Sequence, residues 1–214
     1  MNICFINGSP KASPKSNSSH FIHELSKFFD KNINFTEFYA SKILNDMSAL
    51  EKISLSDKII FVSPLYADTL PSHMIEFLTI LEQYLTEHNY TGIESYGMVN
   101  CGFYEGVQCK YALDMFKHFS RKCSLNWNFG IGIGGGEYLS DQLEDSIHSE
   151  SLYKVLKVLS NSINSPVNTA NENIFITPDK MNAFIYRAAA NAGWCINAKK
   201  QYNVGISKLF KKCY

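Results

Sequence analysis

The sequence predicts an α/β fold, an open doubly wound sheet of five parallel strands with helices on both faces. Short apolar runs such as I59-I60-F61-V62 have no polar alternation, which indicates strands buried on both sides. Segments with apolar residues at helical spacing follow these runs, so strands and helices alternate along the chain. At 214 residues the chain is shorter than a closed eight-stranded barrel requires.

Each element of this fold follows from a local pattern. Buried or edge strands are expected at residues 3–6, 32–39, 57–63, 96–101 and 125–133, with residues 32–39 at an edge. Helices are expected after Ser19, near 47–53, after Pro71, after Gly106 and from Asp141 through Ile163.

A C-terminal helical extension follows a linker-like stretch. Residues 160–173 are rich in Ser, Asn and Thr, so we divide the chain into a main domain, 1–165, and an extension, 166–214. Within the extension we expect a short strand at 173–177 and a helix that starts at Pro178 and stops near Gly193. The extension is too small to fold alone, and we expect it to pack on the main domain or on a partner in a homodimer.

Composition excludes several classes of function. Lys plus Arg and Asp plus Glu both number 20, which argues against a nucleic-acid surface and against a strongly acidic carrier. No apolar stretch is long enough for a membrane span, and the N-terminal residues do not resemble a signal peptide. Six scattered cysteines without a C-x-x-C pair are typical of a reduced, cytoplasmic protein.

The loop after the first strand has the composition of a phosphate-binding site. It offers the hydroxyls of Ser9, Ser16 and Ser18, the amide of Asn17 and the ammonium of Lys11, and it leads into a helix. Backbone N–H groups and a positive helix terminus would meet one anion there. The spacing does not fit a Walker A loop, and a merely polar turn is the alternative.

Three more strand-end loops are expected at the same edge of the sheet, where ligands of such folds bind. The loop S63-P64-L65-Y66 can lie against a flat ring, and C101-G102-F103-Y104-E105-G106 allows close backbone approach. Ordinary βα turns are the alternative for both. The G-x-G-x-x-G match at 130–135 begins inside a strand, so we interpret 134–136 as close packing against a ligand or a neighbour.

No constellation of side chains predicts a catalytic acid, base or metal site. The six histidines are dispersed, and there is neither H-E-x-x-H nor G-x-S-x-G. Cys101 is either a reactive thiol at the ligand edge or, more commonly, a small buried residue at a strand end. We therefore predict binding residues only, with no catalytic side chain and no metal ligand.

Taken together these motifs resemble the flavodoxin-like, NAD(P)H-dependent FMN reductase family over about residues 1–160. The segments that carry the resemblance are G8-S9-P10-K11 with S16-N17-S18, P64-L65-Y66 with P71 and F77-L78, C101-G102-F103, and the loop at 134–136. The chain departs from the family in lacking the cysteine cluster of its iron–sulfur members. It also has Ile75 or Glu76 and Thr79 where the family often has Lys and Asp.

The resemblance implies a flavodoxin-like fold and a bound FMN. The phosphate would lie on the first loop and the ring between the second and third loops. The implied cofactor-binding residues are Ser9, Lys11, Ser16, Asn17, Ser18, Pro64, Leu65, Tyr66, Cys101, Gly102, Phe103 and Glu105. The implied activity passes hydride from NADPH or NADH through FMN to a small acceptor, such as a quinone, nitro or azo compound or another flavin. A flavodoxin-type electron carrier and a non-catalytic flavin-binding sensor are the alternatives.

Overall fold

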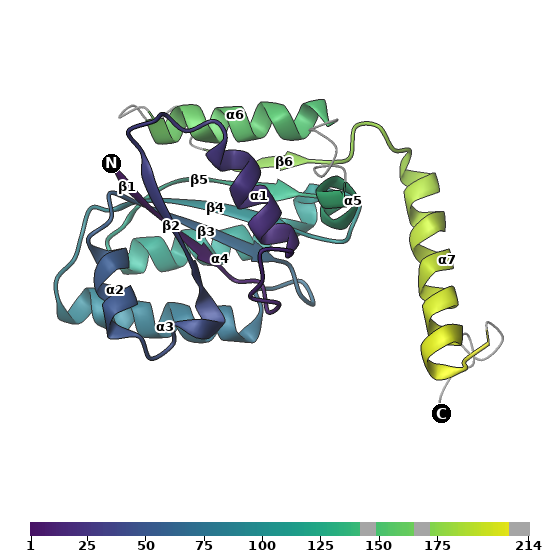
Figure 1. The fold of residues 1–214 in the computed structure, drawn as a ribbon, viewed down its shortest axis with the longest axis horizontal. Coiled ribbons are helices and arrows are strands. Elements are labelled where there is room, and N and C mark those ends of the chain that lie inside the picture. The colour runs from purple at the N-terminus through teal and green to yellow at the C-terminus, as the bar shows by residue number, and fades with distance from the viewer. Residues whose placement is uncertain (142–148, 165–171, 206–214) are drawn as a thin grey trace. The chain divides into compact units, whose positions relative to one another are not determined.

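A single parallel sheet organises the protein. The structure is a computed structural model that describes residues 1–141, 149–164 and 172–205. Its strands are β1 (Asn2–Asn7), β2 (Asn34–Tyr39), β3 (Lys58–Pro64), β4 (Glu94–Asn100), β5 (Asn126–Ile133) and β6 (Ile174–Ile176). They lie in the order β2-β1-β3-β4-β5-β6, and every pair is parallel (Figure 1).

The first five strands have the 2-1-3-4-5 order of flavodoxin-like folds, which confirms the predicted fold class. β2 is an edge strand, as predicted. The sheet has six strands instead of five because the short strand expected near 173–177 pairs with β5, with Ile174 beside Ile131.

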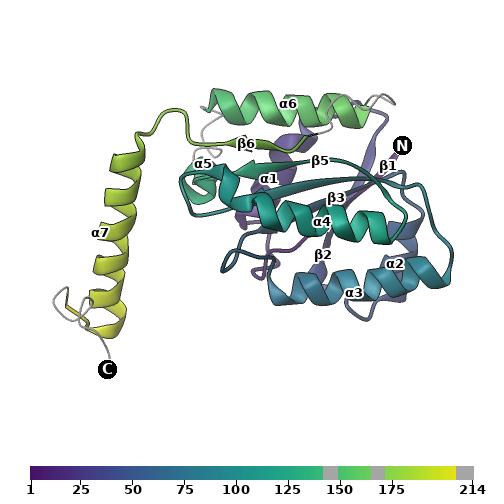
Figure 2. The ribbon, with the colours of Figure 1, turned by 180° about the vertical axis from the view of Figure 1, so that it is seen from behind.

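Helices cover both faces of the sheet (Figures 1 and 2). α1 (Asn17–Ser26), α5 (Gly136–Asp141) and α6 (Glu150–Asn164) lie on one face, and α2 (Met47–Ser54), α3 (Ser72–Glu87) and α4 (Lys110–Lys122) lie on the other. Two 3₁₀ segments, η1 (Ala40–Lys42) and η2 (Gly106–Cys109), connect elements.

The continuous apolar runs are explained by two cores, one on each side of the sheet. In β3, Ile59 and Phe61 pack under α3 and α4, whereas Ile60 and Val62 pack under α1 and α6. All four side chains are fully buried. Successive side chains of a strand point to opposite faces, so a strand covered on both faces needs apolar residues at every position.

The helix expected to run from Asp141 to Ile163 is confirmed only from Glu150 onward, since Asp141 ends a separate helix and Ser149 is not helical. α5 ends at Asp141 and α6 begins at Glu150, and the expected core positions 143 and 147 lie outside the described residues. Within α6, Leu152, Leu156 and Ile163 are buried as expected.

The chain forms two compact units, Met1–Pro178 and Asp179–Tyr214. The first therefore includes β6, which the predicted division after residue 165 places in the extension. In the second, α7 (Ala183–Tyr202) is capped by Asn182, whose side chain accepts a hydrogen bond from the backbone N–H of Phe184. None of the described helices is long and apolar enough to cross a membrane.

The predicted stop at Gly193 is wrong, because α7 continues through it to Tyr202. The residue that ends the helix is Asn203, whose φ of 52° is the left-handed conformation typical of a helix terminus. Asn is the non-glycine residue that adopts this conformation most readily, so it can end a helix as Gly does.

Candidate functional site

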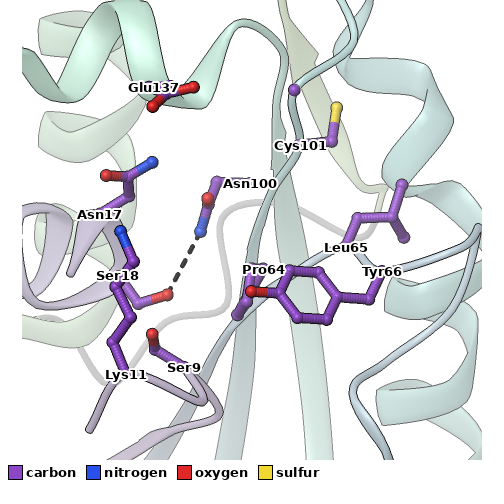
Figure 3. Close-up of a pocket in the computed structure, with 11 residues that line it drawn as sticks. Ser9, Lys11, Asn17, Ser18, Pro64, Leu65, Tyr66, Asn100, Cys101 and Glu137 are labelled. Atoms are coloured by element: carbon purple, nitrogen blue, oxygen red, sulfur yellow. Dashed lines mark hydrogen bonds between the residues drawn. The ribbon is translucent and has the colours of Figure 1, made fainter. Parts of the chain in front are cut away.

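A cavity of about 200 Å³ lies at the carboxyl ends of β1, β3 and β4 (Figure 3). Strand order reverses between β1 and β3, and this is the position where open α/β sheets bind ligands. The cavity is lined by Ser9, Lys11, Asn17, Ser18, Pro64, Leu65, Tyr66, Asn100, Cys101, Gly102 and Glu137.

The fold brings together nine of the twelve residues that the sequence marked for cofactor binding. Ser9, Lys11, Asn17 and Ser18 come from the first loop and the start of α1; Pro64, Leu65 and Tyr66 follow β3; Cys101 and Gly102 follow β4. Ser16, Phe103 and Glu105 do not line the cavity. The binding roles of all twelve stay predictions.

Ser16 is buried at the start of α1 because the helix uses its side chain as an N-cap. The backbone N–H of Ser19 donates to Ser16 Oγ at 3.2 Å, and Ser16 Oγ donates to Ser19 Oγ at 3.1 Å. The first N–H groups of a helix have no partner within the helix, and a Ser at this position supplies one.

Buried polar side chains support the first loop from behind. Asn7 Oδ1 accepts a hydrogen bond from Ser9 N at 2.8 Å, which shapes the turn after β1. Asn7 Nδ2 lies 2.9 Å from Ser19 Oγ and 2.6 Å from Glu37 Oε1, and Ser19 Oγ lies 2.8 Å from the same carboxylate oxygen. Glu37, on the edge strand β2, thereby joins β1 to α1 directly behind the loop.

Two side chains from other elements, Lys42 and His73, contact carbonyl oxygens of the first loop. Lys42 Nζ donates to the carbonyl of Ala12 at 3.0 Å, and Ala12 adopts a left-handed φ of 41°. His73 Nε2, at the start of α3, lies 3.0 Å from the carbonyl oxygen of Gly8. A Cβ at Gly8 would lie 2.8 Å from Ser63 Oγ, so this tight passage requires glycine. Contacts from β1, η1 and α3 therefore fix the conformation of the first loop.

The cavity side of the loop carries groups that bind anions. Figure 3 shows Ser9, Asn17 and Ser18 facing the same space, with Lys11 beside them. Asn100 Nδ2 donates to Ser18 Oγ at 3.3 Å, which leaves the Ser18 hydroxyl proton available to a ligand. Hydroxyl donors at the N-terminus of a ten-residue helix, beside an ammonium group, match a phosphate monoester.

The sequence analysis missed two residues of the cavity, Asn100 and Glu137. Asn100 is the buried polar residue that ends the apolar strand β4, and that position was a usable signal. Glu137 follows the glycine loop directly, and its side chain points into the cavity region above Asn17 (Figure 3). No sequence motif predicts a carboxylate beside anion-binding groups. Glu137 reaches this position only through the placement of α5.

The opposite wall of the cavity is apolar and contains a tight turn. Pro64 and Leu65 continue from β3, and Tyr66, about half exposed, faces the cavity (Figure 3). Tyr66 and Thr69 exchange backbone hydrogen bonds of 2.8 and 3.0 Å around Ala67 and Asp68, whose φ angles of 47° and 63° are both left-handed. Such a conformation is costly for residues other than glycine and is common at functional sites.

Cys101 belongs to a pair of buried thiols. Its Sγ lies 3.7 Å from the carbonyl oxygen of Phe103 and 3.8 Å from that of Glu105, so the backbone of these two residues contacts the Cys101 thiol. A side-chain hydrogen bond with Cys109, in η2, lowers the pKa of Cys101, and the same interaction together with burial raises the pKa of Cys109. Cys101 thus carries the more acidic thiol of the pair, on the cavity wall.

The glycines after β5 serve packing within the protein. A Cβ at Gly134 would lie 2.1 Å from the carbonyl oxygen of Tyr104, and one at Gly136 would lie 3.0 Å from Asn100 Cβ. Gly136 N also donates to the carbonyl of Cys101 at 2.8 Å. Since Gly130 lies inside β5, the G-x-G-x-x-G match is not a dinucleotide loop, and the interpretation as close packing against a neighbour is confirmed.

Comparison with known proteins identifies the fold. No family profile and no curated protein sequence matches the chain. An apo NADH:FMN oxidoreductase, EMOB, is similar with a TM-score of 0.61 at 15% identity over 79% of this chain and 93% of that one. An NADPH-quinone reductase from P. pentosaceus has a TM-score of 0.52 at 16% identity, covering 78% of this chain and 98% of the other.

A third similar structure is a flavodoxin, a WrbA-like protein from Agrobacterium tumefaciens, with a TM-score of 0.52 at 11% identity. It covers 89% of this chain and 98% of its own. At these identities the likeness shows the flavodoxin-like fold, and it is consistent with the resemblance found in the sequence motifs.

Proposed function

We propose that the protein is an FMN-dependent oxidoreductase that takes hydride from NADPH or NADH and reduces a small acceptor. The observation that carries the proposal is the pairing of an anion-binding loop with an apolar, aromatic wall in one cavity at the switch point of the sheet. A phosphate monoester joined to a flat ring has this combination of chemistries. The similar structures, among them an NADH:FMN oxidoreductase and an NADPH-quinone reductase, support the same conclusion.

The residues present fit FMN. Ser9, Asn17 and Ser18 would donate to its phosphate, with Lys11 balancing the charge. Pro64, Leu65 and Tyr66 would contact one side of the ring, and the backbone at Cys101 and Gly102 would approach its edge. Asn100 lies between these groups and Glu137 lines the same cavity, so their oxygens would be able to accept hydrogen bonds from the hydroxyls of the linking polyol (Figure 3).

Bound FMN would supply the redox chemistry, since it accepts hydride from a nicotinamide and passes electrons to an acceptor. The protein's part is to bind and to orient. The first loop fixes the phosphate through a rigid set of donors, while the exposed Tyr66 and the loop after β4 leave room for a second ring. In this proposal no side chain of the cavity is required as a proton donor or acceptor.

The visible spectrum of the purified protein tests the cofactor directly. We expect flavin absorption, with FMN as the compound released on denaturation, and steady oxidation of NADPH or NADH once a quinone, nitro or azo acceptor is added. A protein that binds no flavin would refute the whole assignment. A flavin that is bleached by dithionite and never by either nicotinamide would refute the reductase.

A flavodoxin-type electron carrier is the second candidate, and one observation favours it. The flavodoxin-like unit, residues 1–178, contains 19 Asp and Glu residues and 13 Lys and Arg residues, so it is acidic although the chain is neutral. Acidic surfaces steer carriers onto basic partners. Reduction of the flavin by NADPH or NADH without any partner protein distinguishes the reductase from the carrier.

A further inference from the structure

Buried thiols occur in two settings in the part of the chain that the structure describes. Cys4 and Cys123 are packed in the core and do not line the cavity, and burial raises the pKa of both, that of Cys123 to about 11. Cys101 and Cys109 are also buried free thiols, but a side-chain hydrogen bond joins them. A buried thiol by itself is normally inert, whereas two thiols in contact can be oxidised together.

The ends of the sheet's strands hold this pair in place. Cys101 follows β4 directly, and its backbone N–H donates to the carbonyl of Ile133, the last residue of β5, at 2.9 Å. The backbone of Ile133 is also hydrogen-bonded to Cys109 in η2. A Cβ at Gly106, the first residue of η2, would lie 2.3 Å from the carbonyl oxygen of Ile176, so η2 packs tightly on β6. The contact between the two thiols is therefore fixed by the sheet.

The two thiols differ in access and in acidity. Cys101 lines the cavity of about 200 Å³, whereas Cys109 is fully buried and does not line it (Figure 3). Their hydrogen bond lowers the pKa of Cys101 although burial opposes this, and the same bond and burial raise the pKa of Cys109. The thiolate is the nucleophile in thiol chemistry, so Cys101 is suited to react first and Cys109 second.

We propose that Cys101 and Cys109 form a peroxide-reactive dithiol that closes to an intramolecular disulfide. The Cys101 thiolate attacks one oxygen of a hydroperoxide and the O–O bond breaks. Cys101 becomes a sulfenic acid, and the other oxygen leaves as water or an alcohol with the proton that Cys101 released. Cys109 Sγ then attacks Cys101 Sγ, the S–O bond breaks, and the hydroxyl leaves as water with the thiol proton of Cys109. The two sulfurs lose two electrons, and these reduce the hydroperoxide.

The cavity favours a small oxidant. Only 3% of the Cys101 surface is exposed, so an oxidant reaches its sulfur through the cavity that it lines. The attacked atom must touch the thiolate, and access therefore controls the rate. Hydrogen peroxide fits into a cavity of about 200 Å³, whereas oxidised glutathione is a bulky peptide disulfide. Hydrogen peroxide is therefore the probe of choice.

This inference goes beyond the proposed function, because it rests on the contact between two thiols and not on FMN. Its test uses the full-length protein freed of any bound flavin. A protein that binds no flavin and still forms the disulfide would refute the oxidoreductase and support the dithiol. A protein that binds flavin and forms no disulfide would overturn the dithiol alone.

Peptide mapping after treatment with about 1 mM hydrogen peroxide detects the bond. Remaining thiols are blocked with N-ethylmaleimide, and trypsin releases both cysteines in one peptide, residues 59–110, which contains no internal Lys or Arg. Cleavage after Glu105 then separates Cys101 from Cys109 unless a disulfide joins them. We expect joined fragments that dithiothreitol separates. Two blocked thiols, or oxidation only to sulfinic and sulfonic acids, would overturn the proposal.

Serine variants test the order of the two steps. C109S should stop at the sulfenic acid of Cys101, which dimedone labels, whereas Cys109 in C101S should be labelled at least about tenfold more slowly because it does not line the cavity. C123S removes a buried thiol outside the cavity and should form the disulfide at the wild-type rate. Circular dichroism checks that each variant stays folded. Equal labelling of Cys101 and Cys109 would overturn the assignment of Cys101 as the thiol that reacts first.

Discussion

The two ends of the cavity are built differently. At the end proposed for the phosphate, hydrogen bonds join the first loop to β1, α1, η1 and α3, and Glu37 of β2 joins Asn7 to Ser19 behind it. At the end proposed for the ring, the half-exposed Tyr66 follows Pro64 and Leu65 and precedes a turn in which Ala67 and Asp68 adopt left-handed φ angles. Under the proposed function, the first arrangement would supply affinity through rigid donors, and the second would leave a face open to a reactant.

An added carboxylate at Ser9 tests whether the first loop binds the phosphate. S9D would place a carboxylate among donors suited to a phosphate, and we expect the affinity of the apoprotein for FMN to fall by at least about 100-fold, or about 2.7 kcal/mol. Quenching of FMN fluorescence on binding measures it. S13D adds the same charge to a loop residue that does not line the cavity, and its effect should be clearly smaller. Equal losses in both variants would mean that Ser9 has no direct contact with the phosphate.

Glu37 tests whether the support behind the loop matters. E37A leaves the buried amide of Asn7 and the hydroxyl of Ser19 without their shared acceptor, so the free energy of unfolding should fall by about 1–3 kcal/mol. FMN affinity should fall with it, because the loop loses rigidity. E37Q keeps an acceptor oxygen and should lose much less of both. Urea unfolding of the two variants measures the difference. If E37A has the wild-type free energy of unfolding and FMN affinity, Glu37 does not support the loop.

Alanine variants of Ser16 and Ser18 distinguish the contribution of helix capping to stability from the contribution of ligand binding to FMN affinity. S16A removes the N-cap of α1 and should cost about 1 kcal/mol of stability, with FMN affinity nearly unchanged. S18A removes a cavity hydroxyl and should lower FMN affinity by about tenfold with little loss of stability. Paired melting and binding measurements check this. The opposite pattern would return Ser16 to the binding site that the sequence predicts.

The ring end should respond to relief of strain. Ala67 adopts a left-handed φ of 47°, so A67G should raise the free energy of unfolding by up to about 1 kcal/mol, since the strain removed exceeds the entropy gained by the unfolded chain. A49G, within helix α2, should instead lower it by about 1 kcal/mol. Thermal melting distinguishes them. A destabilised A67G would mean that the turn is not strained.

Much of this architecture could be predicted because its signals are local. Strands such as β3 are visible as continuous apolar runs, and a loop rich in Ser and Lys after a buried strand indicates an anion site whatever surrounds it. The misplaced end of α7 shows the limit of such signals, because a glycine permits a helix end without requiring one. Ser16 shows a second limit, since the same hydroxyl can cap a helix or bind a ligand.

Some features depend on contacts between distant segments. Glu37 reaches Asn7 and Ser19 behind the first loop only because β2 pairs with β1. Glu137 lines the cavity only because α5 begins where the loop after β5 packs on the end of β4. Phe103 and Glu105 stand beside cavity residues in sequence, yet their side chains lie outside the cavity because the chain turns around the Cys101 thiol.

By itself, the sequence determined the alternation of strands and helices, the buried faces and the chemical character of the loops, since these properties depend on each residue's own polarity and spacing. Only the tertiary structure decided which loops meet, which hydroxyl faces the cavity, and that a sixth strand joins the sheet. Those outcomes depend on strand order and on packing between residues far apart in the chain, and no local pattern encodes either.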